Sequence, residues 1–255
     1  MKKKDTSWGS VATWYDGMVS DYDSYQVKVI KPNLSRLMAL QAGEKVLDLA
    51  CGTGFFSAIF AETVGANNVT GVDVGQQLIS IAQKNNPEID FKVSSADNLS
   101  VLPEGHFDKV AIVLAIQNIA EVKAMLQELN RVVKPGGLVY IVMNHPAFRI
   151  PKRSSWGFDE ATNQQYRRID GYLRESKESI DMKPGSEASD QTTVSFHRPL
   201  QYYLKLFSAS GFVLTRLEEW ISDKHSQNGP RQKEEDRMRS EIPLFLFMEI
   251  RKSVN

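Results

Sequence analysis

Five short apolar runs recur between Glu44 and Asn144, and helix-like segments separate them. Strand-like runs that alternate with helices predict a parallel sheet covered on both faces, because neighbouring parallel strands need a crossover connection. The runs are almost continuously apolar, which indicates that both of their faces are buried. The predicted strands span residues 45–50, 68–74, 89–94, 109–116 and 138–144.

A helix with a clear apolar face is predicted between the fourth and fifth strands. Its apolar residues recur three and four positions apart, which is the spacing of one helical face. The sequence KPGG that follows ends this helix, since glycine suits a left-handed cap and proline cannot continue a helix. The residues of the apolar face are Val122, Met125, Leu126, Leu129, Val132 and Val133.

The regular alternation stops after the fifth predicted strand. Residues 164–173 have a helix-like pattern, and residues 178–183 and 192–196 are predicted to form two strands joined by a turn. The core pattern then resumes with a helix at 199–210 and an antiparallel pair of strands at 212–220 and 242–250. We therefore expect an N-terminal helical flap (1–43), a core (44–144), an inserted cap (145–198) and a segment that completes the core (199–255).

Composition and charge exclude several classes of protein. A hydrophobic content of 42% in 255 residues is enough for a sizeable core. No apolar run approaches the roughly 20 residues of a membrane span, and the first residues lack the apolar centre of a signal peptide, so a cytoplasmic location is expected. The single cysteine excludes an internal disulfide, and the four histidines lack the spacing of metal ligands, so no metal is expected. Basic and acidic residues number 31 each, which disfavours nucleic acid as a partner.

A glycine loop follows the first predicted strand in the sequence VLDLACGTG, which ends at Gly54. Gly52 and Gly54 allow the main chain to turn sharply and to approach a ligand closely. A phosphate-binding loop would continue with lysine, which is absent, and a dinucleotide fold would have glycine where Ser57 stands. The remaining kind of ligand is a nucleoside that carries an amino acid in place of a pyrophosphate.

This loop, followed by an acidic residue at the end of the next strand, resembles the class I S-adenosylmethionine-dependent methyltransferases. The resemblance covers about Val46 to Asn144, where VLDLACGTG, GVDVG and SSADNL match the first three family motifs in order. It implies an α/β fold with a Rossmann-like, seven-stranded, mostly parallel sheet, helices on both faces, an antiparallel C-terminal strand and a cap inserted after the fifth strand. The implied cofactor is S-adenosyl-L-methionine, and the implied product is S-adenosyl-L-homocysteine.

The resemblance also implies which residues bind the cofactor. It places Asp48 near the methionine amino group, Asp73 on the two ribose hydroxyls and Asp97 at the adenine. Carboxylates suit these roles because they accept more than one hydrogen bond. In the structural alternative, Asp73 caps the following helix and Asp97 stabilises a turn. The predicted cofactor-binding residues are Tyr15, Tyr25, Asp48, Ala50, Cys51, Gly52, Gly54, Phe55, Asp73, Val74, Ala96, Asp97, Asn98, Val113 and Leu114.

Methyl transfer is an in-line displacement, so the protein mainly aligns the acceptor and excludes water. The ends of the fourth and fifth strands face the methyl group in this family, which makes Asn118 and His145 predicted catalytic residues. His145 is the candidate base, since histidine titrates near neutral pH. His197, in the segment FHRPL, is the third predicted catalytic residue. For both histidines a purely structural role remains the alternative.

The sequence thus predicts a methyltransferase that modifies an oxygen or nitrogen of a small molecule. One alternative is a tRNA or rRNA base methyltransferase, and another is a protein that binds S-adenosylmethionine without catalysis. The oligomeric state stays open. The RNA alternative requires a basic face formed by Arg149, Lys152, Arg153, Arg167 and Arg168.

Overall fold

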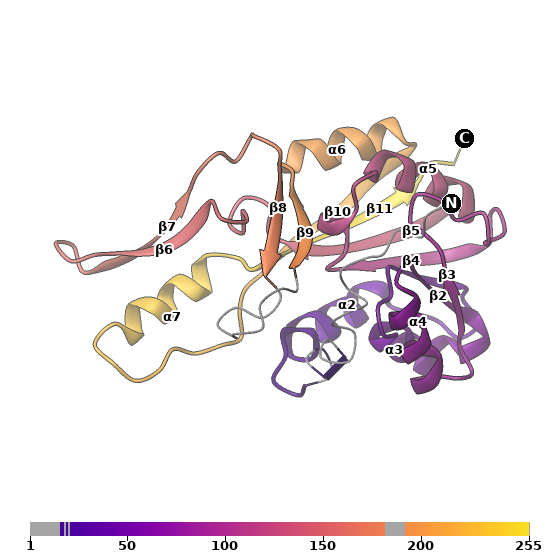
Figure 1. Cartoon of the computed structure of the whole chain (residues 1–255), viewed down its shortest axis with the longest axis horizontal. Helices are drawn as coiled ribbons and strands as arrows, with labels where there is room; N and C mark the ends of the chain where they lie inside the picture. Colours follow the sequence, from indigo (N-terminus) through magenta and orange to yellow (C-terminus); the bar gives the residue numbers. More distant parts are fainter. Residues whose placement is uncertain (1–15, 18, 20, 182–191, 255) are drawn as a thin grey trace.

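A seven-stranded sheet forms the centre of the computed structural model, which describes residues 16, 17, 19, 21–181 and 192–254. The strand order is β10-β11-β5-β4-β1-β2-β3 (Figure 1). Strand β11 is antiparallel to both of its neighbours, and the pairs from β5 to β3 are parallel, which confirms the predicted fold. The strands are β1 Val46–Leu49, β2 Val69–Asp73, β3 Asp90–Val93, β4 Phe107–Val113, β5 Val133–Asn144, β10 Phe212–Trp220 and β11 Phe245–Lys252.

Helices cover both faces of the sheet, and each face has its own hydrophobic core (Figure 1). On one face Leu34 and Phe60 belong to the buried cluster, and on the other face Leu129 and Tyr203 do. The first face carries α2 Lys31–Met38, α3 Phe55–Val64 and α4 Gln76–Asn85, and the second carries α5 Val122–Val132 and α6 Leu200–Ala209. Short helical turns occur at Gln26–Ile30, Ala66–Asn68 and Ile116–Asn118.

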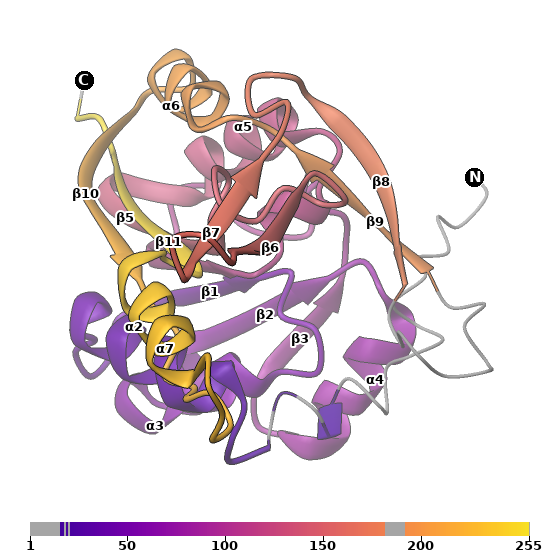
Figure 2. The same cartoon turned by 90° about the vertical axis from the view of Figure 1, so that its left-hand side faces the viewer.

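Two hairpins follow β5. Strands β6 Ser154–Asp159 and β7 Gln164–Ile169 form the first, and β8 Ser176–Asp181 and β9 Thr192–His197 form the second (Figure 2). The strand pair expected at 178–183 and 192–196 is confirmed where the structure describes it. The division of the chain into flap, core, cap and completing segment stays a prediction.

The helix predicted at 164–173 is wrong, because most of this segment is strand β7. Exposed and half-buried residues alternate along β7, which is the period of a strand. The guanidinium of Arg167 lies over the ring of Trp156 on the paired strand, 4.9 Å from its centroid. Cross-strand pairing therefore outweighs the local helical pattern.

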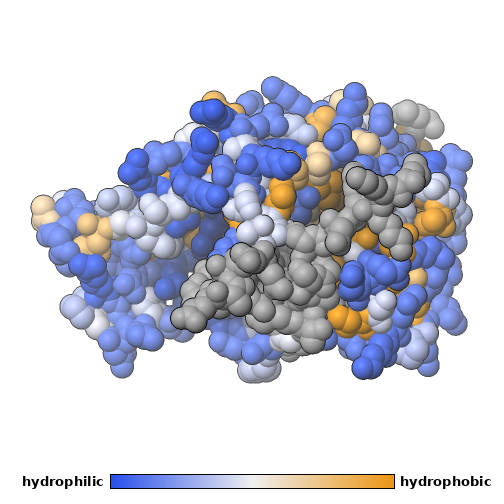
Figure 3. Space-filling view, viewed as in Figure 1, coloured by the Kyte–Doolittle hydropathy of each residue, from blue (hydrophilic) through white to orange (hydrophobic). Residues whose placement is uncertain are grey.

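The segment between β10 and β11 contains α7 Gln232–Glu241, which accounts for the charged residues there. Glu234 of α7 accepts a hydrogen bond from the backbone N–H of Gln165 at 3.0 Å, so α7 lies beside β7. Strands β6 and β7 and helix α7 form a lobe that projects from the sheet (Figure 1). The visible surface of this lobe is mainly hydrophilic (Figure 3). Within the described residues no helix has the length and apolar character needed to cross a membrane.

Helix α5 ends at Val132, one residue before the predicted end at Val133, and KPGG follows Val133. The expected left-handed glycine cap is wrong, since the residue after the helix, Val133, is extended. Strand β5 begins at Val133, and Gly136 adopts a φ of 75° between the pair Phe107–Val133 and the pair Lys109–Leu138. The positive φ of Gly136 thus occurs where the pairing of β4 with β5 shifts its register.

Candidate functional site

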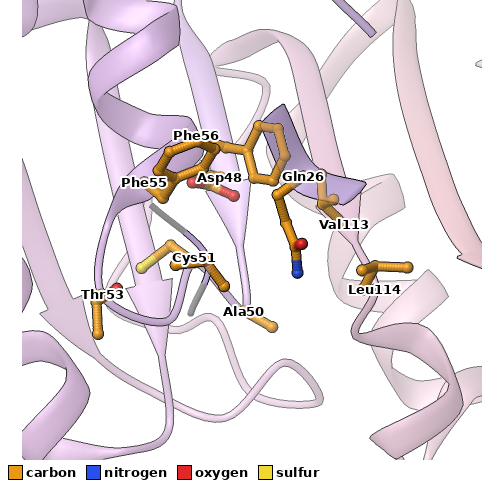
Figure 4. Close-up of a pocket in the computed structure, with 10 residues that line it drawn as sticks. Gln26, Asp48, Ala50, Cys51, Thr53, Phe55, Phe56, Val113 and Leu114 are labelled. Atoms are coloured by element: carbon orange, nitrogen blue, oxygen red, sulfur yellow. The ribbon is translucent and has the colours of Figure 1, made fainter. Parts of the chain in front are cut away.

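The strand order reverses between β1 and β4, and ligands of open α/β sheets bind outside the carboxyl ends of the strands at such a point. A narrow pocket lies there, between the glycine loop and the end of β4 (Figure 4). The loop reaches it through three residues with positive φ, namely 60° at Ala50, 57° at Gly52 and 84° at Gly54. The lining residues are Val19, Gln26, Asp48, Ala50, Cys51, Thr53, Phe55, Phe56, Val113 and Leu114.

Asp48 is almost completely buried at the end of β1, with 2% of its surface exposed. Its Oδ2 accepts a hydrogen bond from Ser57 Oγ at 2.6 Å. Burial raises the pKa of Asp48 to about 7, and the nearby Asp73 charge acts in the same direction. A cationic group in this pocket would lower that pKa, so the site favours a ligand that carries an ammonium group.

Asp73 ends β2 and links the glycine loop to the start of α4. Its Oδ2 accepts from the backbone N–H of Gly52 at 3.0 Å, and its Oδ1 accepts from the N–H of Gly75 at 2.7 Å. Burial raises the pKa of this carboxyl group, while the two backbone donors oppose the rise. The bond to Gly75 is the expected structural role. Each oxygen has further acceptor capacity, so Asp73 also suits a pair of ribose hydroxyls.

A larger pocket of about 290 Å³ adjoins the first and shares Ala50 with it. Predicted residues Asp73, Val74, Ala96, Asp97 and Asn118 all line it. The Asp97 carboxylate is hydrogen-bonded to the hydroxyl of Ser95. The hairpin β8–β9 contributes Lys177, Val194 and Phe196 to the opposite wall.

Four of the predicted cofactor-binding residues that the structure describes are absent from the lining of both pockets: Gly52 and Gly54, which belong to the glycine loop, and Tyr25 and Asn98. Tyr25 packs edge-on against Phe245, with ring centroids 5.7 Å apart, and its hydroxyl is 3.1 Å from Ser222 Oγ. Asn98 is exposed and accepts a hydrogen bond from the N–H of Ser100 at 3.3 Å. A further predicted residue, Tyr15, lies outside the described residues.

A third, polar pocket lies beyond the ends of β4 and β5 and contains His197. His197 Nε2 donates to the carbonyl oxygen of Tyr172 at 2.7 Å. Phe196 lines both this polar pocket and the 290 Å³ pocket, so the two are neighbours. The remaining residues of the polar pocket are Gln117, Met143, Asn144, Pro146, Arg149, Pro151, Ser195, Arg198 and Tyr203.

His145 is absent from the lining of the three pockets, and both of its ring nitrogens are hydrogen-bonded. Its Nδ1 accepts from the N–H of Ala147 at 3.2 Å, and its Nε2 lies 2.7 Å from Glu219 Oε1. Since Nδ1 accepts, the neutral ring carries its proton on Nε2 and donates it to Glu219. Burial lowers the pKa of His145 and also that of His197.

Several lining residues were not predicted, among them Gln26, Thr53, Lys177 and Phe196. Gln26 points between the glycine loop and the end of β4 (Figure 4), and Thr53 Oγ1 is buried without a hydrogen-bond partner among the described residues. Thr53 lies within CGTG, so the motif itself contained the signal. Lys177 and Phe196 belong to a hairpin whose docking on the core has no local signature in the sequence.

Comparison with known proteins agrees with this geometry. Residues 46–137 match a family model described as a methyltransferase domain. The glycine loop and the ordered motifs lie within this match, which agrees with the resemblance of the sequence to the class I S-adenosylmethionine-dependent methyltransferases.

The matches to curated relatives cover only part of each relative's length. A demethylmenaquinone methyltransferase from Oceanobacillus iheyensis is 32% identical over 149 residues, which make up 56% of this chain and 63% of that protein. One from Lysinibacillus sphaericus is 33% identical over 135 residues, 51% of this chain and 57% of that protein. The matches thus span less than two thirds of these relatives.

Solved structures share the fold over most of the chain. An S-adenosylmethionine dependent methyltransferase from Mesorhizobium loti has a TM-score of 0.69 and 24% identity, covering 88% of this chain and 99% of that one. The DhpI-SAH complex has a TM-score of 0.58 and 16% identity, covering 97% and 94%. At these identities the likeness establishes the fold.

The residues present fit S-adenosylmethionine, the cofactor that the resemblance implies. The Asp48 carboxylate, with its raised pKa, and Thr53 Oγ1, which has no hydrogen-bond partner among the described residues, line the narrow pocket. Asp73 and Asp97 line the adjoining larger pocket. This order suits the amino acid, the ribose and the adenine of one extended ligand.

Proposed function

We propose that this protein is a cytoplasmic S-adenosylmethionine-dependent methyltransferase that methylates an oxygen or nitrogen of a small molecule. The observation that carries the proposal is that the three pockets are neighbours. The narrow pocket and the 290 Å³ pocket share Ala50, and the latter shares Phe196 with the polar pocket. An acceptor in the polar pocket would lie next to the cofactor, under the hairpin β8–β9.

When bound, the cofactor supplies an electrophilic methyl group. Asp48 would hold its amino group, and Asp73 would hold its ribose hydroxyls. Gln117 Nε2 donates to the carbonyl oxygen of Leu114 at 2.7 Å, which leaves the buried Oε1 as an acceptor without a partner among the described residues. That oxygen can orient the O–H or N–H of an acceptor. The hairpin excludes water from the reaction.

The arrangement of basic residues supports a small molecule over RNA. Of the basic face that RNA binding would need, Arg168 forms an ion pair with Asp170 at 2.7 Å and Lys152 lies 3.6 Å from Glu178. Arg167 donates to the carbonyl oxygen of Phe148, and Arg149 lines the polar pocket. The named activity of the relatives, on demethylmenaquinone, also concerns a small molecule.

The test is incubation with S-adenosylmethionine labelled in its methyl group and a cell extract separated into RNA, protein and metabolite fractions. We expect label in a low-molecular-mass metabolite, which mass spectrometry then identifies by its gain of one methyl group. Heat-denatured protein is the control. Label confined to RNA, or tight cofactor binding without transfer into any fraction, would contradict the proposal.

The affinity for S-adenosylmethionine should rise as the pH rises through about 7. Burial raises the pKa of Asp48 to about 7 in the free protein, and a bound ammonium group favours the ionised form. Binding near pH 6 should therefore release up to about one proton. Calorimetry in two buffers of different ionisation enthalpy counts this proton, and Asp48→Asn should abolish its release. A pH-independent affinity would show that Asp48 does not contact the amino group.

The same raised pKa has a consequence for stability in the absence of ligand. Between about pH 4 and pH 7 the folded protein holds more protons on Asp48 than the unfolded chain does, so this group lowers stability as the pH rises across that window. Asp48→Asn should remove the effect.

A further inference from the structure

Arg149 is a half-buried cation that the described part of the chain leaves without a counterion. It follows β5 and lines the polar pocket. Its guanidinium forms no hydrogen bond or ion pair with a described residue. Burial lowers the pKa of Arg149; the neighbouring Tyr25 opposes this effect, and the charge of Arg239 adds to it. Because a desolvated charge is costly unless it is paired, this arrangement calls for an anionic partner.

The surroundings of Arg149 are basic. Arg167 donates from Nε and Nη2 to the carbonyl oxygen of Phe148 at 2.9 and 2.8 Å, and its pKa is lowered by burial and, to a smaller extent, by the charge of Arg149. Arg239 donates to Ser226 Oγ at 3.2 Å. Among the described residues neither of these arginines forms an ion pair with a carboxylate. The three guanidinium groups therefore create a local positive potential.

The polar pocket offers a second donor in Tyr203. This residue is fully buried, and its hydroxyl has no hydrogen-bond partner among the described residues. Burial raises the pKa of Tyr203 to about 12, against the lowering effect of the Arg198 charge. The hydroxyl thus stays protonated and can donate to an anion.

The main chain of Arg149 is held by the turn that begins at His145. The N–H of Arg149 donates to the carbonyl oxygen of His145 at 2.8 Å. The hydrogen bonds of the His145 ring to Ala147 and Glu219 fix that turn against β10. The guanidinium is therefore presented from a well-anchored backbone.

We propose that Arg149 and Tyr203 bind an oxyanion of the methyl acceptor, a carboxylate or a phosphate, so that the acceptor is an anionic small molecule. The inference rests on the proposed methyltransferase function. A guanidinium group presents a planar fork that matches two oxygens of either anion. The reacting group of the acceptor would then lie toward Gln117 and the neighbouring cofactor pocket.

The test uses the protein saturated with S-adenosylhomocysteine and labelled with ¹⁵N-arginine. Inorganic phosphate is titrated in one arm and acetate in the other, and the Nε–Hε signal of Arg149 is identified by its loss in Arg149→Gln. We expect a saturable shift of this signal in at least one arm. The arm with the tighter binding distinguishes a phosphate from a carboxylate.

Variants decide whether Arg149 itself binds the anion. By calorimetry, the affinity for the bound anion should fall at least tenfold in Arg149→Gln and severalfold in Tyr203→Phe, whereas Arg168→Gln, an exposed control, should leave it unchanged. Without anion, Arg149→Gln should raise the unfolding midpoint by about 2 °C or more, because an unpaired half-buried charge is removed. A structural arginine would give the opposite shift.

Equal anion affinity in the wild type, Arg149→Gln and Tyr203→Phe would overturn the inference, as would the absence of anion binding to the wild type. The affinity for S-adenosylhomocysteine is measured in the same samples. If that ligand fails to bind, the proposed function falls, whatever the anion titration shows.

Discussion

Replacing Asp73 by Asn is expected to weaken the binding of S-adenosylmethionine and S-adenosylhomocysteine by about 10- to 150-fold. A hydrogen bond to a charged acceptor contributes about 1.5 to 3 kcal/mol, and about 1.4 kcal/mol corresponds to a factor of ten. The carboxylate of Asp73 already accepts from Gly52 at 3.0 Å and from Gly75 at 2.7 Å. The Asn side chain would place an N–H₂ group against one of these two backbone donors. The substitution should therefore weaken both the hydrogen bonds that hold the glycine loop and those to the ribose. Isothermal titration calorimetry measures the change.

Asp90→Asn is the matched control. Asp90 is an exposed carboxylate at the other end of the neighbouring strand β3, paired with Lys92 at 2.9 Å. Its replacement should leave the cofactor affinity unchanged. If a folded Asp73→Asn variant binds S-adenosylhomocysteine as tightly as the wild type, Asp73 has only its structural role at the start of α4.

Arg198→Gln is expected to lower the free energy of unfolding by about 3 kcal/mol. Arg198 is 5% exposed, and it donates to the carbonyl oxygens of Ile119 at 2.9 Å and Ala120 at 2.8 Å. Its guanidinium also lies 4.7 Å from the ring centroid of Phe196. The shorter Gln side chain cannot reach both carbonyl groups, so at least one stays buried without a partner. Urea denaturation followed by circular dichroism gives the free energy.

The Arg198→Gln substitution should also weaken cofactor binding. Ile119, Ala120 and Phe196 all line the 290 Å³ pocket, so Arg198 joins its two walls. We therefore expect weaker binding of S-adenosylhomocysteine in Arg198→Gln as well. Arg168→Gln removes a guanidinium that is 67% exposed and should change stability by less than about 0.5 kcal/mol. Equal stabilities of the two variants would show that the bonds of Arg198 contribute nothing.

The sequence predicts the parallel core well because each strand there carries its own signal. Val46–Leu49 is buried throughout, as is Val110–Ile112 within β4, and burial on both faces makes such runs easy to recognise, although the predicted strand at 109–116 extends three residues beyond the end of β4 at Val113. The helix prediction for residues 164–173 fails because a short polar segment is compatible with both the helical and the strand period. Only the pairing with β6 determines that this segment forms a strand. In this segment, contacts with the rest of the protein outweigh the local secondary-structure propensity.

The residues of the candidate site likewise fall into those with a local sequence signal and those without one. Asp48 and Asp73 are predictable because they belong to local motifs at strand ends. The contributions of Lys177 and Phe196 are not, because they depend on how a hairpin more than fifty residues beyond the fourth strand docks on the core. The geometry of His145, bonded to Glu219 across 74 residues, likewise has no local trace in the sequence.

The position of β11 between β5 and β10 dictates an order of assembly. Strands β1 to β5 can pair as they leave the ribosome, whereas β10 has no partner in the sheet until β11 has been synthesised. The glycine loop and the carboxylates of Asp48 and Asp73, which lie at the ends of β1 and β2, can therefore form early. The part of the site next to β10, including the anchor for the turn of Arg149, must wait for a contact between distant segments, which is the slow kind of folding step. A nascent chain of this protein should thus form the carboxylate side of the cofactor pocket first, and complete that pocket and the polar pocket only after the later segments have docked.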